Sequence, residues 1–130
     1  MAHILIIDDS ELNSMILAHR LKANGFSVDV AGENSKALEK ARNLPNNSLI
    51  IIDRYIQEPN EFKTIEKIKN DQSTTHIPVI AFSKTLMQED FEYAKQLGCD
   101  EICKRDIEEL DELTSTIHTL LNQKKIKNAG

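Results

Sequence analysis

Short apolar runs alternate along the chain with longer segments whose apolar residues recur at helical spacing. The clearest run, Ser48–Asp53, contains four consecutive bulky apolar residues and stops at a carboxylate. A run this short and this rich in β-branched residues predicts a strand buried on both faces, as in the centre of a parallel sheet. Other candidate strands are Ile4–Ile7, Phe26–Val30, Val79–Phe82 and Glu101–Cys103.

Helical spacing marks the segments between these runs and after the last one. Ser10 is a suitable N-cap for a first helix, which Asn24-Gly25 would end, and its apolar positions from Leu12 to Leu21 form a broad stripe. Three further helices are expected around Ala37–Leu44, Phe62–Ile68 and Met87–Leu97. The clearest amphipathic pattern belongs to the last helix, through Leu110, Leu113, Ile117, Leu120 and Leu121.

Five strands alternating with five helices predict an α/β fold, a doubly wound five-stranded parallel sheet with helices on both faces. We expect the strand order 2-1-3-4-5, with the Ser48–Asp53 strand in the middle. A length of 130 residues suits one domain, which we assign to residues 1–123. Residues 124–130 are expected to form a short, disordered polar tail.

Composition excludes several classes of function. A formal net charge of -5 disfavours nonspecific nucleic-acid binding, which needs clustered Lys and Arg. No apolar segment approaches the ~20 residues that span a bilayer, and the N-terminus lacks the features of a signal peptide, so we expect a cytoplasmic protein without a membrane partner. Two cysteines, Cys99 and Cys103, are too few for a disulfide framework or a four-cysteine zinc site.

Reactive side chains stand at the ends of four predicted strands. The acidic pair Asp8-Asp9 follows the first strand, Asp53 ends the third, Ser83 the fourth and Lys104 the fifth. Because the carboxyl ends of parallel strands lie at one edge of the sheet, we expect these side chains to form one site.

The types of these side chains favour one kind of chemistry. Three neighbouring carboxylates repel each other, and oxygen ligands of this kind suit Mg²⁺ or Mn²⁺. Lys104 would add a positive charge and Ser83 a hydrogen-bond donor for an anion with several oxygens. The arrangement predicts phosphoryl transfer to Asp53, which would yield an aspartyl phosphate.

These residue types, in this order and at this spacing, resemble the pattern of a known family. From His3 to about Gln123, the chain resembles the receiver domain of two-component response regulators, particularly the single-domain type. The resemblance implies phosphorylation of Asp53 by a histidine kinase or a histidine phosphotransfer protein. It also implies Mg²⁺ held by Asp9, Asp53, the backbone carbonyl of Tyr55 and, through water, Asp8.

A protein of this kind would catalyse its own phosphorylation from a phosphohistidine donor and its own dephosphorylation, and we expect no other enzymatic activity. It would signal to a downstream protein by contact or pass the phosphoryl group on in a phosphorelay. The sequence identifies neither partner.

Several positions depart from the family pattern. Glu101 stands where an aromatic residue is usual, Lys84 where a small residue is usual and Arg105 where proline is usual. Gln57 and Glu61 replace the usual proline and glycine of the loop after the phosphoacceptor. These changes are either drift at surface positions or an altered switch, in which Lys84 and Glu101 pair until a phosphoryl group competes for the lysine.

Three alternative functions stay open at this point. An atypical receiver could act as a phosphorylation-independent protein interaction module, which the altered switch positions favour and the complete site opposes. A flavodoxin-like cofactor protein is disfavoured because Asp8-Asp9 would repel the flavin phosphate. A metal-dependent phosphatase is disfavoured because neither acidic strand end has the Asp-x-Asp pattern.

Overall fold

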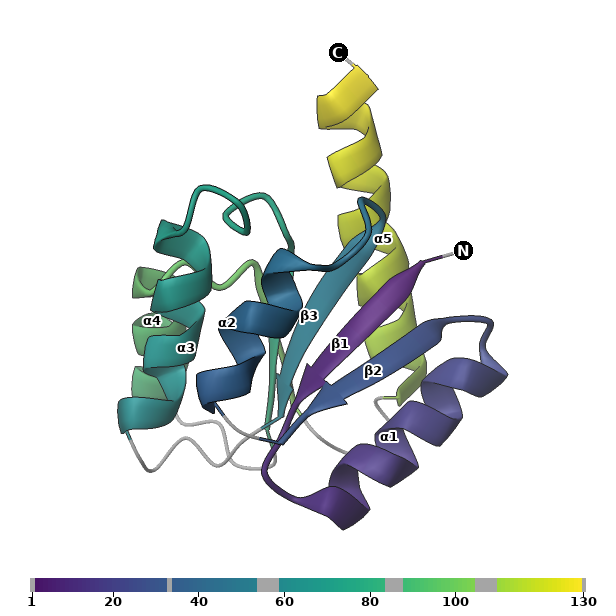
Figure 1. Cartoon of the computed structure of the whole chain (residues 1–130), viewed down its shortest axis with the longest axis horizontal. Helices are drawn as coiled ribbons and strands as arrows, with labels where there is room; N and C mark the ends of the chain where they lie inside the picture. Colours follow the sequence, from purple (N-terminus) through teal and green to yellow (C-terminus); the bar gives the residue numbers. More distant parts are fainter. Residues whose placement is uncertain (1, 33, 54–58, 84–87, 105–109, 130) are drawn as a thin grey trace.

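The computed structural model describes residues 2–32, 34–53, 59–83, 88–104 and 110–129. Within these ranges, parallel strands form one five-stranded sheet in the order β2-β1-β3-β4-β5 (Figure 1). The strands are β1 (His3–Ile7), β2 (Ser27–Ala31), β3 (Ser48–Asp53), β4 (Val79–Ser83) and β5 (Glu101–Lys104). The predicted fold class, the strand order and the central position of β3 are confirmed.

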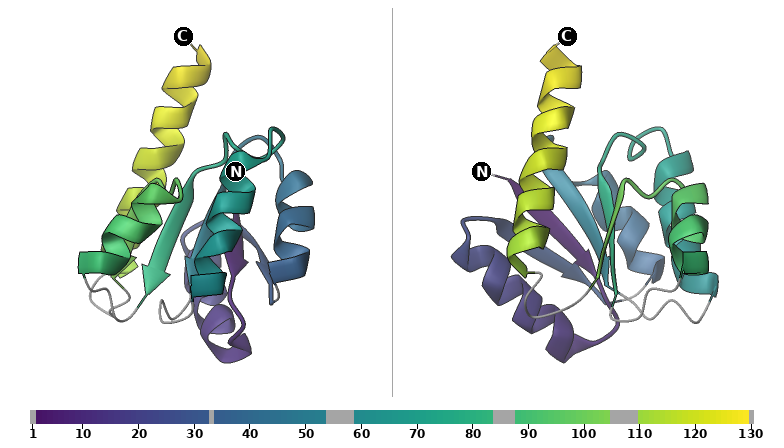
Figure 2. Two further views of the ribbon diagram at one scale, coloured as in Figure 1. Left: turned by 90° about the vertical axis from the view of Figure 1, so that its left-hand side faces the viewer. Right: turned by 180° about the vertical axis from the view of Figure 1, so that it is seen from behind.

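Helices cover both faces of the sheet, which confirms the doubly wound arrangement. Helices lie on each side of the sheet in Figures 1 and 2. The first face carries α1 (Glu11–Ala23) and α5 (Leu110–Ala129). The second carries α2 (Asn34–Arg42), α3 (Pro59–Asn70) and α4 (Gln88–Gln96).

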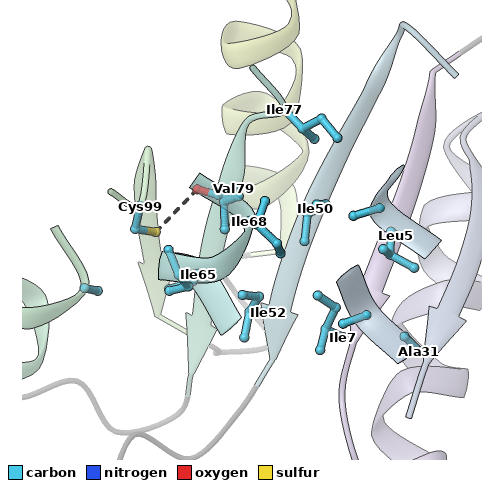
Figure 3. Close-up of a cluster of buried hydrophobic side chains, with 14 residues drawn as sticks. Leu5, Ile7, Ala31, Ile50, Ile52, Ile65, Ile68, Ile77, Val79 and Cys99 are labelled. Carbon is cyan, nitrogen blue, oxygen red and sulfur yellow. Dashed lines mark hydrogen bonds between the residues drawn. The ribbon is translucent and has the colours of Figure 1, made fainter. Parts of the chain in front are cut away.

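Alternate residues of β3 enter two separate hydrophobic cores. Ile50 and Ile52 pack with Ile65 of α3 on the face that carries α2, α3 and α4 (Figure 3). Leu49 and Ile51 pack on the opposite face, against α1 and α5. Full burial of a Leu or Ile side chain stabilises the fold by about 1.5–3 kcal/mol, so both layers hold β3 and fix where its last residue lies.

The first helix begins and ends where the sequence predicts. Ser10 is its N-cap and accepts a hydrogen bond from the backbone N–H of Asn13, and Gly25 after its end has a φ of 90°. The broad apolar stripe, however, is only half buried. Leu17 and Leu21 are in the core, whereas a second set is exposed: Leu12 by 68%, Met15 by 63% and Ile16 by 51%.

The last helix is longer than the sequence analysis predicts. It continues to Ala129, so residues 124–129 are helical where we expected the disordered polar tail to begin. This segment has no Pro or Gly before Gly130, and Lys124 anchors it by donating from Nζ to the carbonyl oxygen of Asn46 at 2.6 Å. None of the described helices has the length and apolar character needed to cross a membrane.

Candidate functional site

The register of the sheet brings the predicted strand-end residues to one edge, which we call the carboxyl edge. Ile7 of β1 pairs with Ile52 of β3, so Asp8 and Asp53 follow at the same level of neighbouring strands. On the other side of β3, Ser83 of β4 pairs with Lys104 of β5. The labelled strands β1, β2 and β3 run towards this edge in Figure 1.

The backbone therefore confirms that the five predicted residues follow or end strands at one edge. For Asp53, Ser83 and Lys104 the described structure gives the backbone and not the side chains. The chemistry of the site consequently rests on the strand register together with the two acidic residues whose side chains are described.

Asp8 is a buried carboxylate with a defined position. Its side chain is 3% exposed, and its Oδ1 accepts a hydrogen bond from the backbone N–H of Ser10 at 2.9 Å. Its own backbone N–H donates to the carbonyl oxygen of Ala31 at 3.1 Å, which extends the pairing of β1 with β2 by one residue. The turn into α1 thus holds Asp8 at the carboxyl edge, while Asp9 beside it is exposed.

These acidic residues are a suitable donor set for a hard divalent cation. Burial of a carboxylate is costly unless hydrogen bonds or a positive charge compensate for the lost water. Asp8 and Asp9 are adjacent, and the register places Asp53 level with Asp8, so oxygen ligands of the kind that Mg²⁺ or Mn²⁺ prefers come from two neighbouring strands. Among the side chains that the structure describes, no three His, Cys, Asp or Glu residues form a metal-binding group.

The structure describes only some of the residues that depart from the family pattern. Tyr55, Gln57, Lys84 and Arg105 lie outside the described residues, and Glu61 is in α3. Glu101 is described: it is exposed at the start of β5, where it pairs with Ile80. Its side chain lines a cavity of about 270 Å³ beside α5, together with Asp100 and Glu112.

Of the predicted pair Lys84 and Glu101, the strand register places only Glu101, because Lys84 lies outside the described residues. Ile80, the partner of Glu101, lies three residues before Ser83, the last residue of β4, which corresponds to roughly 10 Å of strand. Glu101 is thus level with the early part of β4 and not with the carboxyl edge. An electrostatic switch built from these two residues stays a hypothesis.

The sequence analysis does not predict one surface feature close to the site. The exposed side of α1 carries Leu12, Met15 and Ile16, only a few residues after Asp9 at the site. Spacing of i, i+3 and i+4 puts these three side chains on one side of the helix. The sequence shows this apolar stripe. The stripe is wider than one buried helix face, and this width is the signal that part of it stays exposed.

Comparisons with known proteins agree with this architecture. Residues 4–118 match the family model of the response regulator receiver domain. The chain is 29% identical over 104 residues to the polar-differentiation response regulator DivK of Brucella ovis, over 80% of this chain and 84% of that protein.

Solved structures show the same fold. A CheY-like receiver domain protein from Methanospirillum hungatei superposes with a TM-score of 0.82 at 20% identity, over 98% of both chains. The receiver domain of a sensor histidine kinase from Pseudomonas aeruginosa, which has a magnesium ion coordinated in its active-site cleft, gives a TM-score of 0.78 at 19% identity, over 93% of this chain and 98% of that one.

Proposed function

Because the chain belongs to the response regulator receiver domain family of two-component signalling, we propose that it is a phosphoacceptor modified on Asp53. The observation that carries this proposal is the register, which aligns Asp8 with Asp53 and Ser83 with Lys104 at one edge. The residue types at these four positions are the ones that phosphoryl transfer to a carboxylate requires.

In the proposed reaction, a carboxylate oxygen of Asp53 attacks the phosphorus of a donor phosphohistidine. The new P–O bond forms as the P–N bond breaks, and the donor imidazole leaves with the electron pair of that bond. Lys104 neutralises part of the charge on the phosphoryl oxygens, and the hydroxyl of Ser83 donates a hydrogen bond to one of them.

The acidic residues have a separate role in this proposal. Asp8, Asp9, Asp53 and the backbone carbonyl of Tyr55 would hold Mg²⁺, with Mn²⁺ as a substitute. When bound, such a cation supplies positive charge that offsets the carboxylates and the phosphoryl oxygens. The magnesium ion in the receiver domain from Pseudomonas aeruginosa supports this assignment.

The exposed side of α1 supports contact with a partner protein. Leu12, Met15 and Ile16 form an apolar surface directly after the acidic pair, so a protein bound there would be close to the carboxyl edge. We propose that a histidine kinase or a histidine phosphotransfer protein delivers the phosphoryl group from this side. The phosphorylated protein would then act on a downstream protein or pass the group on in a phosphorelay.

Intact-mass spectrometry after incubation with acetyl phosphate and Mg²⁺ tests the phosphoacceptor. We expect one added phosphoryl group on the native chain, none without Mg²⁺ and none on Asp53→Asn. The matched control is Asp29→Asn, because Asp29 is an exposed aspartate of β2 that pairs with Lys40. This variant should be phosphorylated to the same extent as the native chain.

Two results would contradict the proposal. One is an equal adduct on Asp53→Asn and the native chain. The other is no adduct on the native chain combined with no change in its NMR spectrum on addition of beryllofluoride and Mg²⁺, a probe that does not depend on the lifetime of the phosphoryl group. The second result would identify the protein as a phosphorylation-independent interaction module.

A further inference from the structure

A cavity of about 240 Å³ lies at the end of the sheet where the strands begin, which we call the amino edge. Three segments that are far apart in the sequence meet there: the end of α3 with the turn that follows it, the residue before β5, and the second half of α5 (Figures 1 and 2). The polar residues that line this amino-edge cavity are Lys69, Thr75, His76, Asp100, Gln123 and Lys124. Three of these side chains are basic and one is acidic.

The one acidic side chain is already neutralised. Nζ of Lys69 lies 2.7 Å from Oδ2 of Asp100, and it also donates to the carbonyl oxygens of Ile77 at 2.8 Å and Thr75 at 3.3 Å. An ammonium group has three N–H donors, so these contacts use all of them. Lys69 therefore holds the amino edge together and adds positive charge to the cavity, but it has no donor left for a ligand.

Lys124 is placed differently. Its Nζ donates to the carbonyl oxygen of Asn46, and within the described part of the chain its two other N–H bonds have no protein acceptor. Burial and the nearby charge of Lys69 lower the pKa of Lys124. Burial, followed by the charges of Lys124 and Lys69, lowers the pKa of His76.

The cavity thus gathers more positive charge than its own carboxylate offsets. With Lys69 paired to Asp100, the remaining charge is that of Lys124, and protonation of His76 would add a second. The chain as a whole carries a net charge of -5, so this positive region is local. A bound anion would offset the charge of Lys124 and favour protonation of His76.

We propose that the amino-edge cavity binds a small tetrahedral oxyanion of the phosphate type, either free inorganic phosphate or a phosphomonoester. Lys124 and the protonated imidazole of His76 donate to its oxygens, and the hydroxyl of Thr75 and the amide of Gln123 are further donors. Since one water occupies roughly 30 Å³ of liquid, the cavity has room for the anion and several waters. This site is at the opposite end of the sheet from Asp53 and does not depend on phosphorylation there.

Titration with inorganic phosphate tests the proposal, with EDTA present to remove divalent cations and NaCl used to keep the ionic strength constant. NMR spectra of the native chain should show saturable changes at His76 and Lys124. The apparent pKa of His76 should rise when phosphate is bound, because the anion favours the imidazolium over the neutral ring. This effect should outweigh the positive charges of Lys69 and Lys124. Asp100 should not produce the same rise, because it is paired with Lys69. Asp53→Asn should bind phosphate as the native chain does, which separates this test from that of the phosphoacceptor.

A matched pair of lysine variants identifies the residue responsible. Lys124→Gln should weaken phosphate binding about tenfold, because a charge-assisted hydrogen bond is lost. Lys95→Gln removes one positive charge from an exposed position of α4 and should leave the affinity unchanged. His76→Gln should weaken binding mainly below the pKa of the imidazole, and it serves as a second test if Lys124→Gln disturbs the end of α5.

The source of the anion is distinguished by a second titration with a phosphomonoester such as phosphoserine. Tighter binding of the ester than of inorganic phosphate assigns the cavity to a modified partner, and the reverse assigns it to the free ion. Spectral changes that grow linearly with concentration, that chloride reproduces, or that appear at Asp8 and Asp9 instead would overturn the proposal. Equal affinity of Lys124→Gln, His76→Gln and the native chain would also overturn it.

Discussion

The two edges of the sheet use charged residues in opposite ways. At the amino edge, the carboxylate of Asp100 lies 2.7 Å from the ammonium of Lys69, and it also accepts a hydrogen bond from the backbone N–H of Val79 at 2.8 Å. At the carboxyl edge, Asp8 and Asp9 follow β1 at the level of Asp53 on the neighbouring strand, so charges of one sign gather. Carboxylates are therefore paired with cations at the amino edge, whereas they gather at the carboxyl edge, where we propose phosphoryl transfer.

Hydrogen bonds to backbone carbonyls reinforce this difference. Thr74 is fully buried at the amino edge, and its hydroxyl donates to the carbonyl oxygen of Ile68 in the last turn of α3 at 2.6 Å. Lys69 and Lys124 likewise donate to carbonyl oxygens of turns that precede strands. Because unpaired carbonyls at helix ends and turns are costly when buried, these contacts indicate a structural role for the amino edge.

The largest effect on stability that we predict concerns Gly98, which precedes β5 at the amino edge. Its φ is 101°, and a Cβ there would lie 3.0 Å from Cγ of Lys69, the lysine paired with Asp100. Gly98→Ala should therefore lower the free energy of unfolding by about 2 kcal/mol, through backbone strain and displacement of Lys69. Urea unfolding measures this loss, and acetyl phosphate should still phosphorylate the folded variant.

The matched control is Gly25→Ala at the end of α1. Gly25 has a similar φ of 90°, but nothing lies within 4 Å of the position of its missing Cβ. Gly25→Ala should lower the free energy of unfolding by only about 1 kcal/mol, because backbone strain is its only cost. Equal losses in the two variants would mean that the contact with Lys69 does not matter for the amino edge.

The next prediction compares the substitution of aspartate by asparagine at the two edges of the sheet. Asp8→Asn keeps an acceptor for the N–H of Ser10 but removes one charge from the acidic group, so in Mg²⁺-free buffer it should raise the free energy of unfolding by about 1 kcal/mol. Asp100→Asn should lower it by about 0.5–1 kcal/mol, because the partly exposed ion pair with Lys69 is lost. Urea unfolding of both variants, with and without Mg²⁺, measures the signs.

Magnesium adds a second readout to this comparison. Addition of Mg²⁺ should stabilise the native chain and Asp100→Asn, and it should stabilise Asp8→Asn much less, because a ligand that binds only the folded state increases stability. If both variants changed stability in the same direction and responded equally to Mg²⁺, the contrast between the two edges would be wrong.

The sequence predicted the architecture because the central strands are buried on both faces. Runs such as Ser48–Asp53 suit the middle of a parallel sheet, and parallel strands bring Asp53, Ser83 and Lys104 to one edge. The strand order was expected from the flavodoxin-like arrangement and is confirmed. The periodicity of α1 could not show which of its apolar residues would stay uncovered, because Ile16 and Leu17 are adjacent in sequence and differ only in what packs against them.

Residues that act through distant partners were the least predictable. Lys124 was assigned to a disordered tail, because its contact with Asn46 joins positions 78 residues apart and leaves no local signal. Glu101 could be counted as three residues before Lys104, but only the register shows that it lies beside Ile80. The amino-edge cavity, which is lined by three separate segments, was therefore not visible in the sequence.

The smallest effect that we predict is a pH dependence at the amino edge. The pKa of Asp71 is lowered from 3.8 to about 2, first by hydrogen bonds from the Ser73 hydroxyl at 2.6 Å and from Arg42 at 2.6 Å, and also by the Ser73 backbone N–H. Between pH 4 and pH 2 the unfolded chain binds more protons at this position than the folded chain does. The contribution of Asp71 to stability is therefore fully present above about pH 4 and is lost as the pH falls towards 2.

An NMR titration of the Asp71 carboxyl carbon measures this pKa directly, and urea midpoints between pH 4 and pH 2 measure its effect on stability. Asp71→Asn should remove the part of the pH dependence of stability that Asp71 contributes. Ser73→Ala should move the pKa back towards 3.8, because it removes the side-chain hydrogen bond that has the largest influence. A normal pKa for Asp71 in the native chain would show that the Ser73 and Arg42 hydrogen bonds do not stabilise its carboxylate. Lys69 and Asp100 would then be the remaining compensated pair among those described here at the amino edge.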